Sequence, residues 1–157
     1  MELKFKVAAR IAKPVEEVFE AVVDPSSLSS YFTTGGAKGR LEKGAAVAWD
    51  FHDFPGAVPV EVLDVVENEK IVLQWEAFEE SGDDGDVTGA GYHTRMTMEF
   101  KALEDGRTLV TIAEQGWRED EHGLKSSYGN CEGWTQMLCS LKMWVEHGIN
   151  LRAGYYK

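Results

Sequence analysis

Cysteines and long apolar runs are both scarce in this chain of 157 residues. The only cysteines are Cys131 and Cys139. On one helix they would lie about 12 Å apart along the axis, beyond the ~5.5 Å Cα spacing of a disulfide, so we expect both to be reduced and packed. No apolar run approaches the ~20 residues that cross a bilayer, which excludes an integral membrane protein.

Positive charge is also in short supply. The chain has 16 Lys and Arg residues against 27 Asp and Glu residues, for a formal net charge of -11. Nucleic acids and anionic lipids are normally met by clustered cations, so neither is an expected partner. The segment from Met1 to Arg10 alternates apolar and charged residues and has no secretory-signal pattern, so a cytoplasmic location is expected.

Motifs for metal, cofactor or nucleophile chemistry are missing as well. The four histidines, His52, His93, His122 and His147, lack the close spacing of zinc ligands, so no metal is expected. No phosphate-cradling glycine loop, dinucleotide fingerprint or serine nucleophile elbow is present, so no cofactor is expected. Neither cysteine has a histidine nearby in the sequence to activate it as a nucleophile.

What remains is the pattern of one α+β domain spanning residues 1–157. Apolar and polar residues alternate from Leu3 to Ile11, which predicts a strand with one wet face. Pro14 and the apolar spacing that follows predict a short helix that stops at Asp24-Pro25. A second short helix is expected around Leu28–Phe32, before the glycine turn at 35–36.

A meander of six strands is predicted next, punctuated by turn residues that include Pro55-Gly56 and Asp105-Gly106. Acidic residues cluster in 79–91 and in 119–121, and both segments are interpreted as solvated loops. The predicted strands are Gly39–Leu41, Ala45–Phe51, Val58–Val65, Lys70–Phe78, Tyr92–Leu103 and Arg107–Trp117.

From about Ser126 to Leu151 the period becomes helical and predicts one long closing helix. The order of elements, the sequence Gly133-Trp134 and the ending from His147 to Arg152 resemble the Hsp90-ATPase-activator-like (AHSA1-like) branch of the START/Bet v 1 superfamily, also called the SRPBCC group. The apolar stripe of this helix consists of Cys131, Trp134, Leu138, Leu141, Val145 and Ile149.

This resemblance implies a helix-grip fold, in which a curved seven-stranded antiparallel sheet wraps around the long C-terminal helix, with two short helices after the first strand. It also implies a hydrophobic cavity between sheet and helix, which in relatives holds lipids, polyketides, hormones or aromatic metabolites. Relatives differ in activity, so the resemblance does not name the ligand.

The residues themselves also favour such a cavity, because the inward face of the predicted sheet is large and aromatic. The alternative is that these side chains interdigitate at core density and leave no void. The candidate ligand-binding residues are Tyr31, Trp49, Phe51, Val60, Leu73, Trp75, Met96, Met98, Ile112, Glu114, Trp134, Leu138 and Leu141.

Glu114 is the one charged residue among these candidates. Val110 and Ile112 on the same strand are predicted to point inward. Because side chains on a strand alternate with a period of two residues, Glu114 is predicted to point inward as well. There it would have a raised pKa and could accept a ligand's hydrogen bond or act as a general base. The alternative is a bulged or finished strand that leaves Glu114 in solvent or paired with an arginine.

Three functions fit these observations. The first is binding of a small hydrophobic or aromatic molecule in the cavity. The second is a cyclase or hydrolase type of enzyme that uses the same cavity, with Glu114 or a tyrosine as acid or base. The third is a protein-interaction module, with Hsp90 itself not expected as partner because the resemblance covers the isolated domain only.

Overall fold

The computed structural model describes residues 1–54, 56–81 and 84–157. Pro55, half of the predicted Pro55-Gly56 turn, lies outside the described residues, as do residues 82–83 of the acidic segment. The elements in chain order are β1 (Lys4–Ile11), α1 (Val15–Val23), α2 (Pro25–Tyr31), β2 (Gly36–Lys38), β3 (Ala46–Asp50), β4 (Val58–Val66), β5 (Lys70–Ser81), β6 (Asp86–Ala102), β7 (Thr108–Gln115) and α3 (Glu121–His147).

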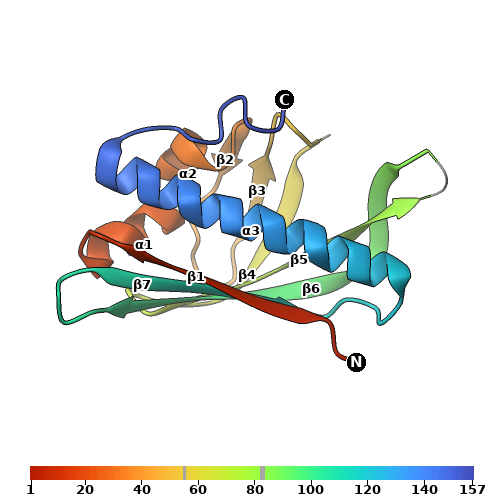
Figure 1. The fold of residues 1–157 in the computed structure, drawn as a ribbon, viewed down its shortest axis with the longest axis horizontal. Helices are drawn as coiled ribbons and strands as arrows, with labels where there is room; N and C mark the ends of the chain where they lie inside the picture. The colour runs from red at the N-terminus through yellow and green to blue at the C-terminus, as the bar shows by residue number, and fades with distance from the viewer. Residues whose placement is uncertain (55, 82–83) are drawn as a thin grey trace.

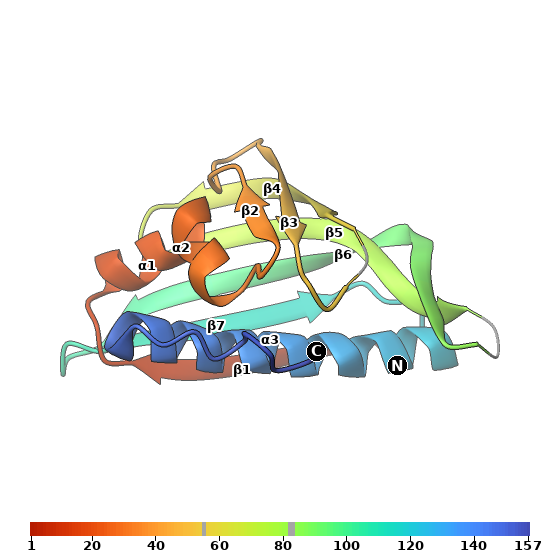
Figure 2. The same cartoon turned by 90° about the horizontal axis from the view of Figure 1, so that it is seen from above.

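The seven strands form one antiparallel sheet in the order β1-β7-β6-β5-β4-β3-β2. The sheet curves around α3, while α1 and α2 pack near the C-terminal end of that helix (Figures 1 and 2). The β5–β6 hairpin extends past the other end of α3, and the segment after the helix turns back across it (Figure 1). This is the predicted helix-grip α+β fold, with its two short helices after the first strand.

Local sequence explains the bounds of the long helix. Asp120 is the N-cap of α3, and its carboxylate accepts a hydrogen bond from the Gly123 amide at 2.8 Å. Gly148 ends the helix in the left-handed conformation, with φ of 69°, which glycine adopts without strain. None of the helices in the described part of the chain combines the length and the apolar character that a bilayer crossing requires.

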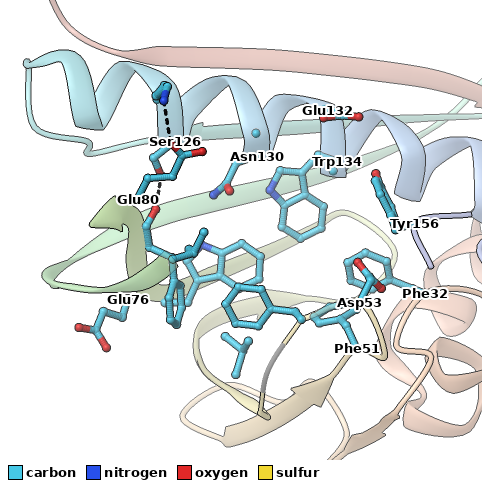
Figure 3. A pocket seen from close by; sticks show the side chains of 18 of the residues that line it. Phe32, Phe51, Asp53, Glu76, Glu80, Ser126, Asn130, Glu132, Trp134 and Tyr156 are labelled. Atoms are coloured by element: carbon cyan, nitrogen blue, oxygen red, sulfur yellow. Dashed lines mark hydrogen bonds and ion pairs between the residues drawn. The ribbon is translucent and has the colours of Figure 1, made fainter. Parts of the chain in front are cut away.

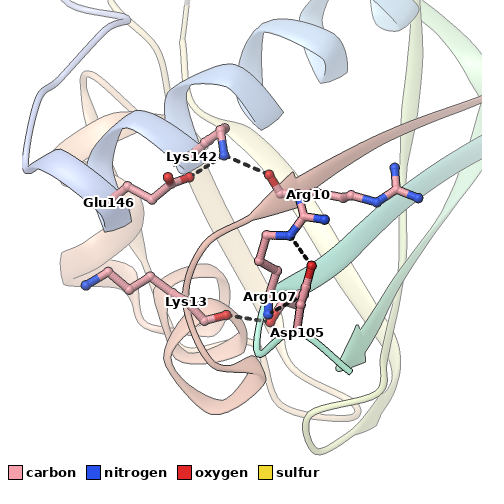
Figure 4. A network of polar contacts seen from close by, with 7 residues as sticks. Arg10, Lys13, Asp105, Arg107, Lys142 and Glu146 are labelled. Atoms are coloured by element: carbon pink, nitrogen blue, oxygen red, sulfur yellow. Dashed lines mark hydrogen bonds and ion pairs between the residues drawn. The ribbon is translucent and has the colours of Figure 1, made fainter. Parts of the chain in front are cut away.

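Polar contacts fasten the C-terminal half of α3 to β1 (Figure 4). Lys142 donates to the main-chain oxygen of Arg10 at 2.8 Å and pairs with Glu146. Nearby, the hydroxyl of Thr108 at the start of β7 donates to the main-chain oxygen of Lys13, also at 2.8 Å. The Lys142 contact holds the last turns of the helix against β1, which lies at the edge of the sheet.

Four details of the predictions are wrong. Residues 39–41 form no strand, and the edge strand β2 lies just before them. The acidic segment 79–91 is mostly strand, because β5 runs to Ser81 and β6 starts at Asp86. Helix α3 spans residues 121–147 and not 126–151, which leaves Ile149 outside it and 53% exposed. Cys139 is free but exposed, and not packed.

Candidate ligand-binding site

A partly open pocket of about 340 Å³ lies between the N-terminal half of α3, strand β5 and the segment that joins β3 to β4. Figure 3 shows side chains from these elements facing one another across it. The helix supplies Ser126, Gly129, Asn130, Gly133 and Trp134, which recur every three or four residues and therefore share one face of α3.

Aromatic rings form most of the apolar lining. Trp134 stacks on Trp75 with ring centroids 5.5 Å apart, and on Phe32 at 5.7 Å. Phe54 meets Phe78 edge to face at 5.0 Å. Such contacts stabilise the rings beyond simple burial and keep their positions fixed. The aromatic residues of the lining are Phe32, Phe51, Phe54, Trp75, Phe78, Trp134 and Tyr156.

Two glycines keep the helical wall open. A Cβ atom built on Gly129 or Gly133 would meet no heavy atom within 4 Å, so the space in front of each is empty. Glycine inside a helix costs about 1 kcal/mol relative to alanine. Two such residues one turn apart are unfavourable for the helix itself, and their position leaves room beside the two tryptophans.

Glu114 lies directly behind the pocket wall. It is 1% exposed, and its carboxylate accepts hydrogen bonds from the indole N–H groups of Trp75 and Trp134, each at 2.9 Å. The Thr94 hydroxyl donates at 2.8 Å, and the Asn130 amide donates to both carboxylate oxygens at 3.0 and 3.2 Å. Three of these four donors, Trp75, Asn130 and Trp134, also line the pocket.

Burial raises the pKa of the Glu114 carboxyl above its usual 4.5, and the hydrogen bonds from the four neighbouring side chains oppose that rise. The inward orientation predicted from the alternation on β7 is confirmed, and the alternative of a solvent-exposed or arginine-paired Glu114 is wrong. The carboxylate does not border the pocket, because the side chains that bond it stand between.

Arg152 closes the end of the pocket near α2. Its side chain is 8% exposed and forms an ion pair with Asp53 at 2.9 Å, and its guanidinium lies over the rings of Phe32 and Phe51 at 5.3 and 4.8 Å. It also donates to Gln136 on α3 at 3.2 Å. Arg152 thereby joins the C-terminal segment both to α3 and to the segment between β3 and β4.

At the opposite end, Lys125 on α3 pairs with Glu80 on β5 at 2.6 Å. The Ser126 hydroxyl donates to the Phe78 main-chain oxygen at 2.7 Å, so the β5–β6 hairpin is held against the start of the helix (Figure 3). These contacts explain why strand β5 continues through residues that the sequence alone suggested were loop.

Of the thirteen predicted ligand-binding residues, three border this pocket: Phe51, Trp75 and Trp134. The other ten lie behind it in the core, where they are almost fully buried. Those positions are closely packed, as the close-packing alternative anticipated, and their contact with a ligand stays a prediction. The ten are Tyr31, Trp49, Val60, Leu73, Met96, Met98, Ile112, Glu114, Leu138 and Leu141.

The prediction missed the polar and glycine members of the lining. Gly129 and Gly133 carried a signal, because glycine inside a helix costs about 1 kcal/mol relative to alanine, and two such residues one turn apart indicate a packing or functional reason for them. Arg152 and Asp53 carried none, since 99 residues separate them in the sequence. Within 1–54, 56–81 and 84–157, no three His, Cys, Asp or Glu residues cluster as metal ligands would.

Comparison with solved structures supports the fold. Protein SSP2350 from Staphylococcus saprophyticus is 26% identical, with 95% of this chain and 96% of that protein covered and a TM-score of 0.74. DynU16, from the dynemicin biosynthetic locus, is 20% identical with a TM-score of 0.76; the match covers 94% of this chain and 49% of DynU16. No curated protein matches the chain significantly.

The Aha1 dimer from Colwellia psychrerythraea has the same fold at 19% identity, with 92% of this chain and 97% of that protein covered and a TM-score of 0.70. The sequence profile of the family described as Activator of Hsp90 ATPase homolog 1-like protein matches residues 12–146, from the end of β1 almost to the end of α3. The chain therefore belongs to the Activator of Hsp90 ATPase homolog 1-like family.

Proposed function

We propose that this protein binds a small, mostly apolar molecule in the pocket between α3 and β5. The observation that carries the proposal is a pocket of about 340 Å³ with seven aromatic side chains in its lining. Pockets for small ligands have volumes of roughly 300–1,000 Å³ and are lined mainly by apolar and aromatic groups with a few polar ones. This pocket has both properties.

The rigidity of the wall supports binding of a defined ligand. Trp75 and Trp134 are held by their stacking and by their bonds to Glu114, so little side-chain freedom is left to lose when a ligand arrives. An acid–base role for Glu114 has weaker support, because its oxygens are already bonded and lie behind the wall. Binding is therefore the function that the geometry favours.

Native mass spectrometry of the purified protein, compared with the denatured mass, tests for a co-purifying molecule. Tryptophan fluorescence then tests binding directly, because two of the indoles line the pocket. Gly133→Leu fills the space in front of the helix, and Gly133→Ala is the matched control, since its added Cβ meets nothing within 4 Å.

We expect ligands to shift the fluorescence and the Tm of the wild type and of Gly133→Ala, and to leave Gly133→Leu unchanged. If a broad set of apolar and aromatic metabolites alters neither quantity in the wild type, the proposal is wrong. Equal responses in Gly133→Leu would place the binding elsewhere and would also contradict it.

A further inference from the structure

The charges around the pocket suggest what kind of ligand it takes. Two cations border it, Arg152 and Lys125, and each is paired with a carboxylate that also borders it, Asp53 at 2.9 Å and Glu80 at 2.6 Å. An anion at either cation would therefore compete with the carboxylate that is already paired there. Separating a largely buried pair such as Arg152 and Asp53 is expensive.

Two further carboxylates border the pocket. Glu76 comes from β5, and one of its carboxylate oxygens accepts a hydrogen bond from the Gly91 amide at 3.0 Å. Glu132 comes from α3 and is exposed. Among the described residues neither forms an ion pair, so the lining of the pocket includes four carboxylates and two cations, a surplus of two negative charges. The net charge of -11 for the whole chain adds to this field.

Asn130 adds a directional acceptor. A carboxylate can only accept hydrogen bonds, so the two contacts between Asn130 and Glu114 are donated by the Asn130 NH₂ group, which therefore points toward Glu114. The Asn130 carbonyl oxygen accepts no hydrogen bond from a described residue. It is also not one of the buried polar atoms that lack a partner, which are Thr33 Oγ1, Trp49 Nε1 and Arg152 Nε. The oxygen is therefore accessible, on a residue that lines the pocket (Figure 3).

The aromatic walls suit the same kind of ligand. The indoles of Trp75 and Trp134 line the pocket while their N–H groups donate to the carboxylate behind them. Aromatic faces attract cations, and a ring N–H bonded to an anion makes the ring more electron-rich. Apolar area, negative charge and a hydrogen-bond acceptor thus converge on one cavity.

We infer that the pocket selects organic ammonium ions with an aromatic or apolar body, with the ammonium N–H donating to the Asn130 carbonyl oxygen. This inference rests on the proposed function and adds the charge and hydrogen-bonding character of the ligand. Anions of the same shape are disfavoured, because the local carboxylates repel them and each local cation is already paired with a carboxylate.

Three probes of one shape test the inference: 4-phenylbutylammonium, 4-phenylbutan-1-ol and 4-phenylbutyrate. Each is titrated into ¹⁵N-labelled protein, and the amide signals of Gly129 and Gly133 report on the pocket. We expect the ammonium ion to bind about tenfold more tightly than the carboxylate, with the alcohol between them, which is the ratio that a few partly screened charges give.

Variants separate the charge effect from simple pocket binding. Glu76→Gln combined with Glu132→Gln is expected to reduce the preference for the ammonium ion over the carboxylate to about threefold or less. The matched control combines Glu99→Gln with Glu104→Gln, which removes the same charge from exposed positions outside the pocket and leaves the preference unchanged.

Asn130→Ala tests the acceptor, with its fold checked by the ¹⁵N spectrum. This variant is expected to bind the ammonium ion and the alcohol more weakly, because both are hydrogen-bond donors, and to bind the carboxylate with unchanged affinity.

The two proposals fail in different ways. If 4-phenylbutyrate binds as tightly as the ammonium ion while Gly133→Leu abolishes both, the charge inference is overturned and the pocket remains a binding site. If no probe binds the wild type, the inference is overturned. If Gly133→Leu binds all three probes as tightly as the wild type, the binding lies elsewhere, and both the inference and the proposed function are overturned.

Discussion

Trp134 on α3 donates its indole N–H to the buried carboxylate of Glu114 on β7 at 2.9 Å. Because hydrogen bonds to charged groups are stronger than neutral ones, this contact is an unusually firm link between the helix and the sheet. Trp134 also lines the pocket, whereas Glu114 lies behind it. The stability of the domain and the shape of the pocket therefore depend on the same side chain.

Trp134→Phe keeps an aromatic ring but removes the donor. We expect the free energy of unfolding to fall by about 2 kcal/mol, as for loss of a buried hydrogen bond to a carboxylate. Trp117→Phe is the control, since Trp117 is also buried but donates to the neutral Ser126 hydroxyl at 3.1 Å. Urea unfolding measures both. Equal losses in the two variants would mean that the charge on the acceptor contributes nothing.

Glu114 should make the stability depend on pH. Burial raises the pKa of its carboxyl in the folded protein above 4.5, so folding favours the protonated form. Its contribution to the free energy of unfolding is therefore complete below pH 4.5 and is lost as the pH rises through the folded-state pKa. One group changes this energy by at most about 1.4 kcal/mol per pH unit.

Glu114→Gln isolates that contribution, because glutamine does not titrate. We expect the stability of the wild type minus that of the variant to decrease as the pH rises from 4 to 8, in urea unfolding at each pH. The other carboxyl groups are present in both proteins and cancel in the difference. A difference that is constant, or that increases with pH, would show that the pKa of Glu114 is not raised.

Gly133→Ala and Gly123→Ala should have opposite effects within one helix. Alanine at 133 has open space and improves helix propensity, so the free energy of unfolding should rise by up to about 1 kcal/mol. A Cβ at 123 would lie 1.9 Å from the Arg118 main-chain oxygen, so that variant should be less stable than the wild type. Thermal unfolding measures both, and destabilisation at 133 would mean that the space is not empty.

Arg152 should stabilise the domain mainly through Asp53. Replacing either residue by alanine leaves a poorly solvated charge without its partner, and we expect the loss of Arg152 to lower the free energy of unfolding by about 3 kcal/mol. A double-mutant cycle should give a coupling energy of about 1–3 kcal/mol, because the second substitution removes the stranded charge. Additive losses would mean that Arg152 acts through its ring contacts instead.

Patterns that depend on neighbouring residues could be predicted from the sequence. Alternation on β7 placed Glu114 inside, and helical spacing placed Trp134 and Leu138 on the inward face of α3. The end of that helix was also readable in principle, because Gly148 is the residue type that terminates helices in the left-handed conformation. The longer prediction gave the apolar Ile149 more weight than the glycine before it.

The position of the pocket depends on contacts between distant segments, which the sequence does not reveal. Arg152 reaches Asp53 across 99 residues, and Lys125 holds Glu80 on a hairpin whose acidic composition suggested a loop. In these places tertiary contacts override local propensity. The aromatic residues were therefore identified correctly as inward, but the sequence could not tell which of them border a cavity and which are packed behind it.

The antiparallel pairing of β1 with β7 has a consequence for the timing of folding. Lys4 lies opposite Gln115, and Ile11 opposite Thr108, so β1 pairs with a strand that the ribosome makes about a hundred residues later. Such distant pairing is slow to form, because a long loop must close first. During synthesis β1 therefore stays without this partner until most of the sheet has emerged, and unpaired strand edges of that kind are prone to aggregation.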